Sequence, residues 1–400
     1  MTRKQNAPEI RFEGFTDPWE QRKLGDLISV YIAHAGPEED VTVLTSSRDG
    51  IQKQEDHFGR LQQHDTSDWN LIPYGYCTYR NRSDDGLFTF NVNKVADRGI
   101  VSKFYPVFET PECDADFLVA YLNSSQEIRK KLFVLAVGTS QVVLSYSALK
   151  ELGLLLPQNR EQSAIANVLN HIDNLITLHQ RKHDKLCTVK KSMLDKMFPK
   201  PGETEPEIRF EGFTDPWEQR KLGELADRYK ELVPTPRNGY VRMGVRSHAK
   251  GTFLTEVEPG QQIEEQELSR VKADNLVVNI VFAWEHAVAI TSVDDAKALV
   301  SHRFPQFSFH DDMEPGFFRY AILDEAFRWH LWLASPSGAG RNKTLNVGTM
   351  LEYEFSVPKK AEQAKIAAFL DRLDDLITLH QRKLELLRNI KKSLLDRMFV

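Results

Sequence analysis

One phrase of 18 residues, PEIRFEGFTDPWEQRKLG, occurs twice in this chain without a change, at Pro8–Gly25 and at Pro206–Gly223. The two copies lie 198 positions apart, close to half of the 400 residues. A phrase of this length stays unaltered when both copies hold the same partner or the same position in a fold. The duplication therefore predicts a chain built from two equivalent frames.

A second repeat confirms this frame. Leu156–Phe198 aligns without gaps on Val357–Phe399, with 23 identities in 43 positions that include an unbroken LITLHQRK. The segments between the repeats, Asp26–Leu155 and Glu224–Ser356, show no alignment by eye. We interpret the chain as two copies of one frame that carry two different inserts, called here the first and second insert.

The second repeat predicts two long amphipathic helices. Glu161–Phe198 contains no proline or glycine, and its apolar residues recur at heptad spacing, as they do in the C-terminal copy. Matched stripes favour pairing of the two helices as a coiled coil. A histidine on each stripe favours a polar layer that fixes the register over a metal or pH-sensing role. The predicted seam residues are Ile165, Ile172, Leu175, His179 and Leu186, with Ile366, Leu373, Leu376, His380 and Leu387.

The inserts are predicted to mix α and β structure. Short runs rich in β-branched and aromatic residues predict strands at Val41–Thr45, Gly75–Tyr79, Leu87–Phe90, Ile100–Phe108, Tyr240–Val245, Leu276–Val281, Val288–Ser292 and Glu352–Val357. Helical spacing predicts helices at Asp114–Leu122, Gln126–Val134, Phe317–Leu323 and Glu325–Ala334.

The composition limits the class of protein. No run of 18 apolar residues is present to span a membrane, and the first residues show no apolar core of a secretory signal. Three cysteines are too few and too scattered for a disulfide framework or a zinc site, so we expect a cytoplasmic protein with reduced thiols. The net charge of −5 is not typical of a nucleic-acid-binding protein, but local basic patches would still allow nucleic-acid binding.

No catalytic motif accompanies this frame. Gly338–Thr344 lacks the Gly-Lys-Thr of a phosphate-binding loop, and no two prolines are adjacent, which excludes the Pro-Pro signature of amino-group methyltransferases. The twelve histidines show no metal-ligand spacing, and acidic pairs such as Asp84-Asp85 are interpreted as exposed turn carboxylates. We expect no catalysis and no metal site in this chain.

The inserts do contain polar, basic and aromatic residues in turn-like stretches. Arginine and asparagine can pair with the edges of guanine and adenine, and either can also hold phosphate. The alternative is that these are ordinary solvated loops. The candidate DNA-binding residues are Ser47, Arg48, Tyr79, Arg80, Asn81, Arg82, Ser140 and Gln141 in the first insert, and Arg246, His248, Lys250, Trp284, His286, Arg341, Asn342 and Lys343 in the second.

The aromatic residues of the duplicated phrase have two interpretations. They serve as plain core, or they form a docking surface that both copies share. These residues are Phe12, Phe15 and Trp19, with Phe210, Phe213 and Trp217.

These features together resemble the specificity (S) subunit of type I restriction–modification systems over essentially the whole chain. The resemblance rests on the duplicated lead-in phrase, on the stretches GTSQVVLSYSALKELGLLLP and NKTLNVGTMLEYEFSVP that close the inserts, and on the paired LITLHQRK helices. It implies an α+β fold in which two target recognition domains are separated by two conserved helices, paired as an antiparallel coiled coil with pseudo-twofold symmetry. The implied domains are 1–155 (lead-in 8–25) and 201–355 (lead-in 206–223), with spacer helices at 156–200 and 356–400.

The resemblance also implies the partners. Double-stranded DNA would be recognised at a bipartite, asymmetric site, two modification (methyltransferase) subunits would dock on the frame, and restriction (helicase-nuclease) subunits would join them. S-adenosylmethionine, ATP and magnesium are then expected on the partner subunits and not on this chain.

Two alternatives stay open at this point. One is a non-catalytic scaffold whose coiled coil assembles other proteins. The other is a single-chain methyltransferase or nuclease, against which the absent motifs argue. The target bases and the length of the spacer between half-sites do not follow from the sequence.

Overall fold

The computed structural model describes residues 7–36, 40–60, 65–124, 126–139, 141–200, 202–338 and 342–399. The chain divides into two compact units. Unit 1 comprises Met1–Arg181 with Gln381–Val400, and unit 2 comprises Lys182–His380. Each unit therefore contains one insert together with a part of each long helix.

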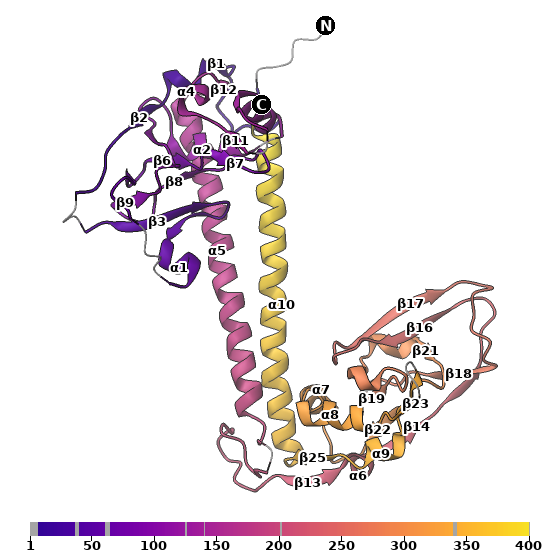
Figure 1. Cartoon of the computed structure of the whole chain (residues 1–400). Coiled ribbons are helices and arrows are strands. Elements are labelled where there is room, and N and C mark those ends of the chain that lie inside the picture. The colour runs from indigo at the N-terminus through magenta and orange to yellow at the C-terminus, as the bar shows by residue number, and fades with distance from the viewer. Residues whose placement is uncertain are drawn as a thin grey trace. The chain divides into compact units, whose positions relative to one another are not determined.

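The two predicted long helices are present as α5 (Asn159–Lys196) and α10 (Lys360–Arg397), each of 38 residues. In unit 1, Lys391 Nζ of α10 lies 2.6 Å from the Asp173 carboxylate of α5. In unit 2, Lys190 Nζ of α5 lies 2.5 Å from the Asp374 carboxylate of α10. These two pairs occupy equivalent positions of the repeat, so the helices pack antiparallel, side by side (Figure 1), and the predicted fold class is confirmed.

Burial along the helices follows the predicted seam at most positions. Lys182 and Lys383, which the same heptad pattern also places on the seam, are exposed, whereas Leu384 is buried. A straight helix with 3.6 residues per turn drifts by about 20° per heptad against a 3.5 repeat, which moves the stripe by one position. Of the seam residues, Ile165, Ile172, Ile366 and Leu373 are buried, and Leu175, His179, Leu186, Leu376, His380 and Leu387 are half-buried.

The first insert contains two four-stranded sheets. One has the order β2 (Ser29–Tyr31), β10 (Val107–Glu109), β6 (Cys77–Tyr79) and β8 (Phe90–Val92). The other has the order β4 (Gly50–Lys53), β3 (Thr42–Ser47), β9 (Arg98–Val101) and β5 (Asn70–Pro73), with β3 and β9 parallel. The helices are α1 (Gln54–Phe58), α2 (Ala115–Ser124), α3 (Gln126–Leu135) and α4 (Tyr146–Leu149).

The second insert repeats this topology with one additional strand, β15, although its sequence does not align with the first. One sheet has the order β14 (Ala226–Tyr229), β22 (Gln306–Phe309), β19 (Asn275–Val278) and β20 (Val288–Ile290). The other has the order β15 (Leu232–Pro234), β18 (Glu267–Arg270), β21 (Leu299–Val300), β16 (Tyr240–Val245) and β17 (Thr252–Val257), with β16 and β21 parallel. The helices are α6 (Leu222–Leu225), α7 (Pro315–Ala321), α8 (Glu325–Leu333) and α9 (Val347–Leu351).

Two of the predicted strands are wrong in extent. Ile100–Phe108 is divided between β9 and β10 by a turn, in which Tyr105 N–H donates to Ser102 O at 2.9 Å and Pro106 has no N–H to donate. Leu87–Phe90 becomes a strand only at its last residue, where β8 begins. The four predicted helices of the inserts are confirmed as α2, α3, α7 and α8, with ends shifted by up to two residues.

Each copy of the duplicated phrase forms a strand that the sequence pattern did not predict. β1 (Glu20–Lys23) pairs antiparallel with β12 (Gly153–Leu156), and β13 (Glu218–Lys221) pairs antiparallel with β25 (Glu354–Val357). Each strand thus joins the beginning of an insert to its end. The two tryptophans of the phrase, Trp19 and Trp217, are buried in the cores of unit 1 and unit 2.

Each lead-in phrase also binds the end of the helix that belongs to the other copy of the repeat. In unit 1, Ile10 N–H donates to Arg397 O of α10 at 3.0 Å, and Phe399 stacks on Tyr121 with ring centroids 4.9 Å apart. In unit 2, Ile208 N–H donates to Lys196 O of α5 at 2.9 Å, and Phe198 stacks on a ring of α7. The duplication is explained by this reciprocal arrangement, because the phrase meets the same kind of neighbours twice.

Candidate nucleic-acid interface

In the first insert the β3–β4 turn carries Ser47 and Arg48. Ser47 Oγ accepts a hydrogen bond from Asp49 N–H at 3.1 Å, and Gly50 follows with φ of 109°, in the left-handed region that favours glycine. Arg48 forms an ion pair with Asp85, and this hydrogen bond lowers the pKa of the Asp85 carboxyl to about 2. The turn is therefore fixed to the segment that contains the second candidate cluster.

The second and third candidate clusters of this insert meet at the same place. Arg82 lies in β7 (Arg82–Ser83), which pairs with β11 (Val142–Val143), and its guanidinium lies 4.3 Å from the ring centroid of Phe104. Gln141 Nε2 donates to Asp84 Oδ1 at 2.8 Å. Asp84 and Asp85, which the sequence analysis assigned to a plain exposed turn, are thus the acceptors that bind Gln141 and Arg48, and the pairing of β7 with β11 places Arg82 beside them.

Tyr79 corrects one prediction. Its side chain is 0% exposed, and its hydroxyl donates to Leu144 O at 3.0 Å inside the core of unit 1. Burial raises the pKa of this phenol. Contact between the Tyr79 side chain and DNA is therefore excluded by its burial at the end of β6.

The remaining predicted residues of this insert have different surroundings. Arg80 is exposed. Asn81 is half-buried, and its main-chain oxygen accepts from Leu144 N–H at 2.9 Å. Ser140 lies outside the described residues.

In the second insert the β16–β17 turn stands at the position of the β3–β4 turn and contains Arg246, His248 and Lys250. Arg246 and Lys250 are exposed, and His248 lies between them. His248 has φ of 61° and Ala249 φ of 48°, and a left-handed backbone at two successive non-glycine residues is strained. Strain of this kind persists only where the surroundings enforce it.

Hydrogen bonds to the Trp284–His286 segment enforce this conformation. His248 N–H donates to Glu285 O and Ala249 N–H to His286 O, both at 2.8 Å. Ser247 Oγ donates to the Glu285 carboxylate at 2.6 Å. The first and second candidate clusters of the second insert are thereby joined.

Lys343 connects the third cluster to the second. It lies in β24 (Asn342–Lys343), which pairs with β23 (Ser337–Gly338). Its Nζ stands 5.1 Å from the ring centroid of Trp284 and 4.8 Å from that of Trp332, so the cation is held by two indoles. Trp332 in turn stacks on Trp329 at 4.7 Å, and both rings are exposed.

His286 corrects a second prediction. It is buried, its Nε2 hydrogen-bonds with Ile322 O at 2.8 Å, and burial lowers its pKa. A DNA contact by this imidazole is excluded because its ring packs against Phe327 of α8 within the core. Arg341 lies outside the described residues, and of Asn342 only the backbone is described.

Each insert therefore links members of its three candidate clusters through direct contacts, beside turns that are equivalent in topology and carry different side chains. Guanidinium, amide, imidazole and ammonium groups of this kind can contact base edges and phosphates. The sequence analysis missed Phe104 and Trp332, because each lies outside the polar stretches that contain Arg82 and Lys343. Over the described ranges, no group of three or more His, Cys, Asp or Glu side chains lies close enough to hold a metal ion.

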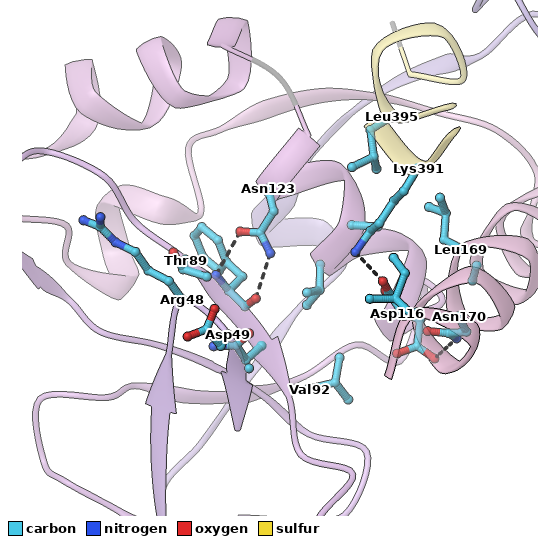
Figure 2. Close-up of a pocket in the computed structure, with 18 of the residues that line it drawn as sticks. Arg48, Asp49, Thr89, Val92, Asp116, Asn123, Leu169, Asn170, Lys391 and Leu395 are labelled. Atoms are coloured by element: carbon cyan, nitrogen blue, oxygen red, sulfur yellow. Dashed lines mark hydrogen bonds and ion pairs between the residues drawn. The ribbon is translucent and has the colours of Figure 1, made fainter. Parts of the chain in front are cut away.

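A groove of about 760 Å³ begins at the β3–β4 turn of unit 1 and extends to the long helices (Figure 2). Arg48 and Asp49 lie at one side of it, and Lys391 and Leu395 of α10 with Leu169 and Asn170 of α5 lie at the other. Asp116 of α2 accepts hydrogen bonds from Lys94 at 2.6 Å and from Asn170 at 2.8 Å. The groove thus brings frame and insert residues together within one unit.

No helix in the described part of the chain is long and apolar enough to cross a membrane.

Comparison with known proteins gives one family. The model of the type I restriction modification DNA specificity domain matches the chain twice, at residues 16–187 and 214–389. Two specificity subunits of Methanocaldococcus jannaschii are similar. That of the type I restriction enzyme MjaVIII is 22% identical over 256 residues, which are 60% of each chain. That of the putative enzyme MjaX is 24% identical over 280 residues, which are 65% of this chain and 61% of the relative.

The chain thus spans about three fifths of the length of these relatives. Among solved structures, the S subunit of a type I restriction–modification system from M. genitalium has the same fold, with a TM-score of 0.55 and 15% identity over 98% of this chain and 99% of that one.

Proposed function

Because this chain belongs to the type I restriction–modification DNA specificity family, we propose that it is the DNA-binding specificity subunit of a type I complex and recognises a bipartite, asymmetric site. One observation carries the proposal. The two inserts share a topology but have different residues at their equivalent turns. The β3–β4 turn presents Arg48, and the equivalent β16–β17 turn presents Arg246, His248 and Lys250. Equivalent turns with unlike side chains read unlike bases, so the two half-sites differ.

The frame supports docking of two copies of one partner. The ion pair between Lys391 and Asp173 in unit 1 recurs as that between Lys190 and Asp374 in unit 2, and the hydrogen bonds of the lead-in phrase recur as well. Two equivalent frames offer two equivalent docking places, which suits a pair of modification (adenine methyltransferase) subunits, joined by restriction subunits. S-adenosylmethionine, ATP and magnesium belong in this proposal to those partners, this chain is non-catalytic, and the complex works in the cytoplasm.

The test is single-molecule sequencing of methylated bases in the host genome with the gene intact, deleted, or carrying a substitution. Deletion is expected to abolish methylation at one split, asymmetric motif. Arg246→Ala, in the second insert, is expected to relax or change one half of that motif and to leave the other half unaltered. The matched variant Arg48→Ala should affect only the opposite half.

Three outcomes distinguish the alternatives. A motif that survives deletion contradicts the proposal. Loss of an assembled complex without any change in DNA methylation favours the scaffold instead. Methylation by the purified chain alone, without a partner, contradicts its assignment as a non-catalytic subunit.

A further inference from the structure

We infer that the groove of unit 1 holds the phosphate backbone of DNA beside the first half-site, so that the long helices take part in DNA binding. This inference rests on the proposed function. It assigns sequence-independent phosphate contacts to Arg129 of α3 and Arg388 of α10, neither of which lies in a predicted reading cluster. Both side chains line the groove together with Arg48.

The charge of the groove is the first argument. Five cationic and three anionic side chains line it, which leaves a surplus of positive charge in a chain whose net charge is negative. A concave surface with a surplus of one sign attracts ligands of the opposite sign. The cations are Arg48, Lys94, Arg129, Arg388 and Lys391, and the anions are Asp49, Asp116 and Asp173.

The second argument is that two of these cations are not paired with a carboxylate. Lys94, Lys391 and Arg48 are neutralised by ion pairs with Asp116, Asp173 and Asp85, respectively. The hydrogen bonds of Arg129 and Arg388, in contrast, go to neutral acceptors, the Asn123 main-chain oxygen at 3.5 Å and the Gln180 side-chain oxygen at 3.1 Å. A guanidinium carries five N–H donors, so both keep donors and full charge for an anion.

The place of the groove is the third argument. One of its walls is the β3–β4 turn, with Arg48, Asp49 and Gly50, where the proposed base reading takes place. A duplex whose major groove receives this turn has its backbone within about 12 Å of it. The groove runs from the turn toward α5 and α10, so a phosphate strand that leaves the reading site crosses its mouth (Figure 2).

The side chains at the equivalent place in unit 2 are different. The main-chain N–H groups of Asp114 and Glu314 both donate to a glutamine of a long helix, so these two residues are equivalent. By this alignment, the small groove residues Val119 and Ala120 of α2 correspond to Arg319 and Tyr320 of α7. Tyr320 OH lies 2.7 Å from Asp371 and 2.9 Å from Asp374, and Arg319 pairs with Asp371 at 3.4 Å. These side chains are larger than Val119 and Ala120 and are paired within unit 2.

The arginines of unit 2 also differ from those of the groove. Arg388 corresponds to Cys187 in the helix repeat, and the arginine of α8, Arg328, forms an ion pair with Glu325 at 3.0 Å. Phosphate contact by the frame is therefore asymmetric and belongs to the first half-site. An acidic protein segment is a poorer candidate for the groove, because the reading turn forms one of its walls.

The experiment is a salt titration of DNA binding by the full-length chain, alone and with its modification subunits. The probes are one duplex that carries the methylated motif of the host and one duplex of the same length without it. Affinity is measured from about 50 to about 200 mM salt for the wild type and for Arg129→Gln/Arg388→Gln. Removal of each phosphate contact is expected to reduce the log–log slope by about 0.9. When both arginines are replaced, the fall in affinity over this range should shrink by roughly tenfold.

The controls separate charge from structure. Arg328→Gln, at the arginine of α8 in unit 2, is expected to leave the slope unchanged because Glu325 already neutralises it. Arg388→Lys should retain the slope, because it keeps the charge. The preference for the motif over the other duplex should stay the same in every variant, because phosphate contacts carry no sequence information.

An unchanged slope in the double variant, with helix content intact by circular dichroism, would overturn the inference. Loss of binding to the modification subunits with no change in slope would overturn it too, and would assign the groove to a protein. If the wild-type chain does not prefer the motif at all, the proposed function fails, and that result is visible before any variant is compared.

Discussion

The buried ion pair between Arg209 and Glu362 gives a prediction whose size follows from the structure. Arg209 donates to both carboxylate oxygens of Glu362, from Nε at 2.9 Å and from an Nη at 2.8 Å, and the second nitrogen also donates to Asp215 O. The side chains are only 13% and 2% exposed. Arg209→Met leaves the Glu362 carboxylate buried without its partner, which costs about 3–5 kcal/mol.

This loss of stability should appear in the thermal unfolding transition of unit 2 and not in that of unit 1. For a unit of about 200 residues, each kcal/mol moves Tm by about 2–4 °C, so we expect a fall of roughly 6–20 °C in the transition of unit 2. Differential scanning calorimetry of the full-length chain measures it. Arg11→Met is the matched variant, because Arg11 binds Glu161 in the same manner in unit 1, with side chains 14% and 2% exposed.

The double variant Arg209→Met/Glu362→Met tests the reason given for the loss. Removal of both charges leaves no uncompensated ion, and apolar replacement of a buried pair is often neutral or stabilising. We therefore expect the double variant to recover most of the stability that Arg209→Met loses. If the single variant lost less than about 1 kcal/mol of unfolding free energy, the reasoning from burial would be refuted. A double variant as unstable as the single one would refute it as well.

Three further predictions concern two core side chains, Phe198 and Tyr79, and the buried His286 of the second insert. Phe198→Ala should destabilise unit 2 by about 3–5 kcal/mol, because the ring is packed against Trp217 and Phe317, and urea unfolding that shows an equal loss in unit 1 would contradict this placement. Tyr79→Phe should cost about 1 kcal/mol by urea unfolding through its lost bond to Leu144 O, while the methylated motif stays the same; a changed motif would restore Tyr79 as a base reader. Burial lowers the folded-state pKa of His286, so the neutral form is favoured by folding, and unit 2 should lose stability as the pH falls below the ordinary value of 6.5. Urea midpoints at about pH 7 and pH 5 should differ less in His286→Gln than in the wild type, and an equal difference would contradict a role for this imidazole.

The sequence predicted the frame well because its evidence is long and repeated. The absence of proline and glycine over 38 residues predicted α5 within two residues at either end, and β16 agrees with the predicted strand at both of its ends. The strands β1 and β13 were not predicted, because EQRK has no apolar alternation. They form only where the end of each insert offers a partner strand.

The candidate interface was predicted in its parts and not in its arrangement. Arg48, Arg82 and Gln141 are separated by up to 93 residues, and the carboxylates that bind Arg48 and Gln141 belong to an Asp-Asp pair with no distinguishing sequence context. Tyr79 and His286 have side chains that suit DNA contact, but strand alternation and a buried turn point them into the core. Residue type predicts what a side chain can bind, whereas tertiary packing decides whether it is accessible.

Core packing also explains why the lead-in phrase is identical in its two copies whereas the turns of the inserts differ. Trp19 packs in unit 1 against Phe117 and Tyr121, both of which also contact Phe399 from the far end of the chain. A change at such a position disturbs a core that two distant segments share, and the equivalent core of unit 2 places the same demand on Trp217. The side chains of the β3–β4 and β16–β17 turns carry no such demand, because the sheets hold the turns through main-chain pairing. One topology can therefore present unlike residues at its two turns while the phrase that joins insert to helix stays identical.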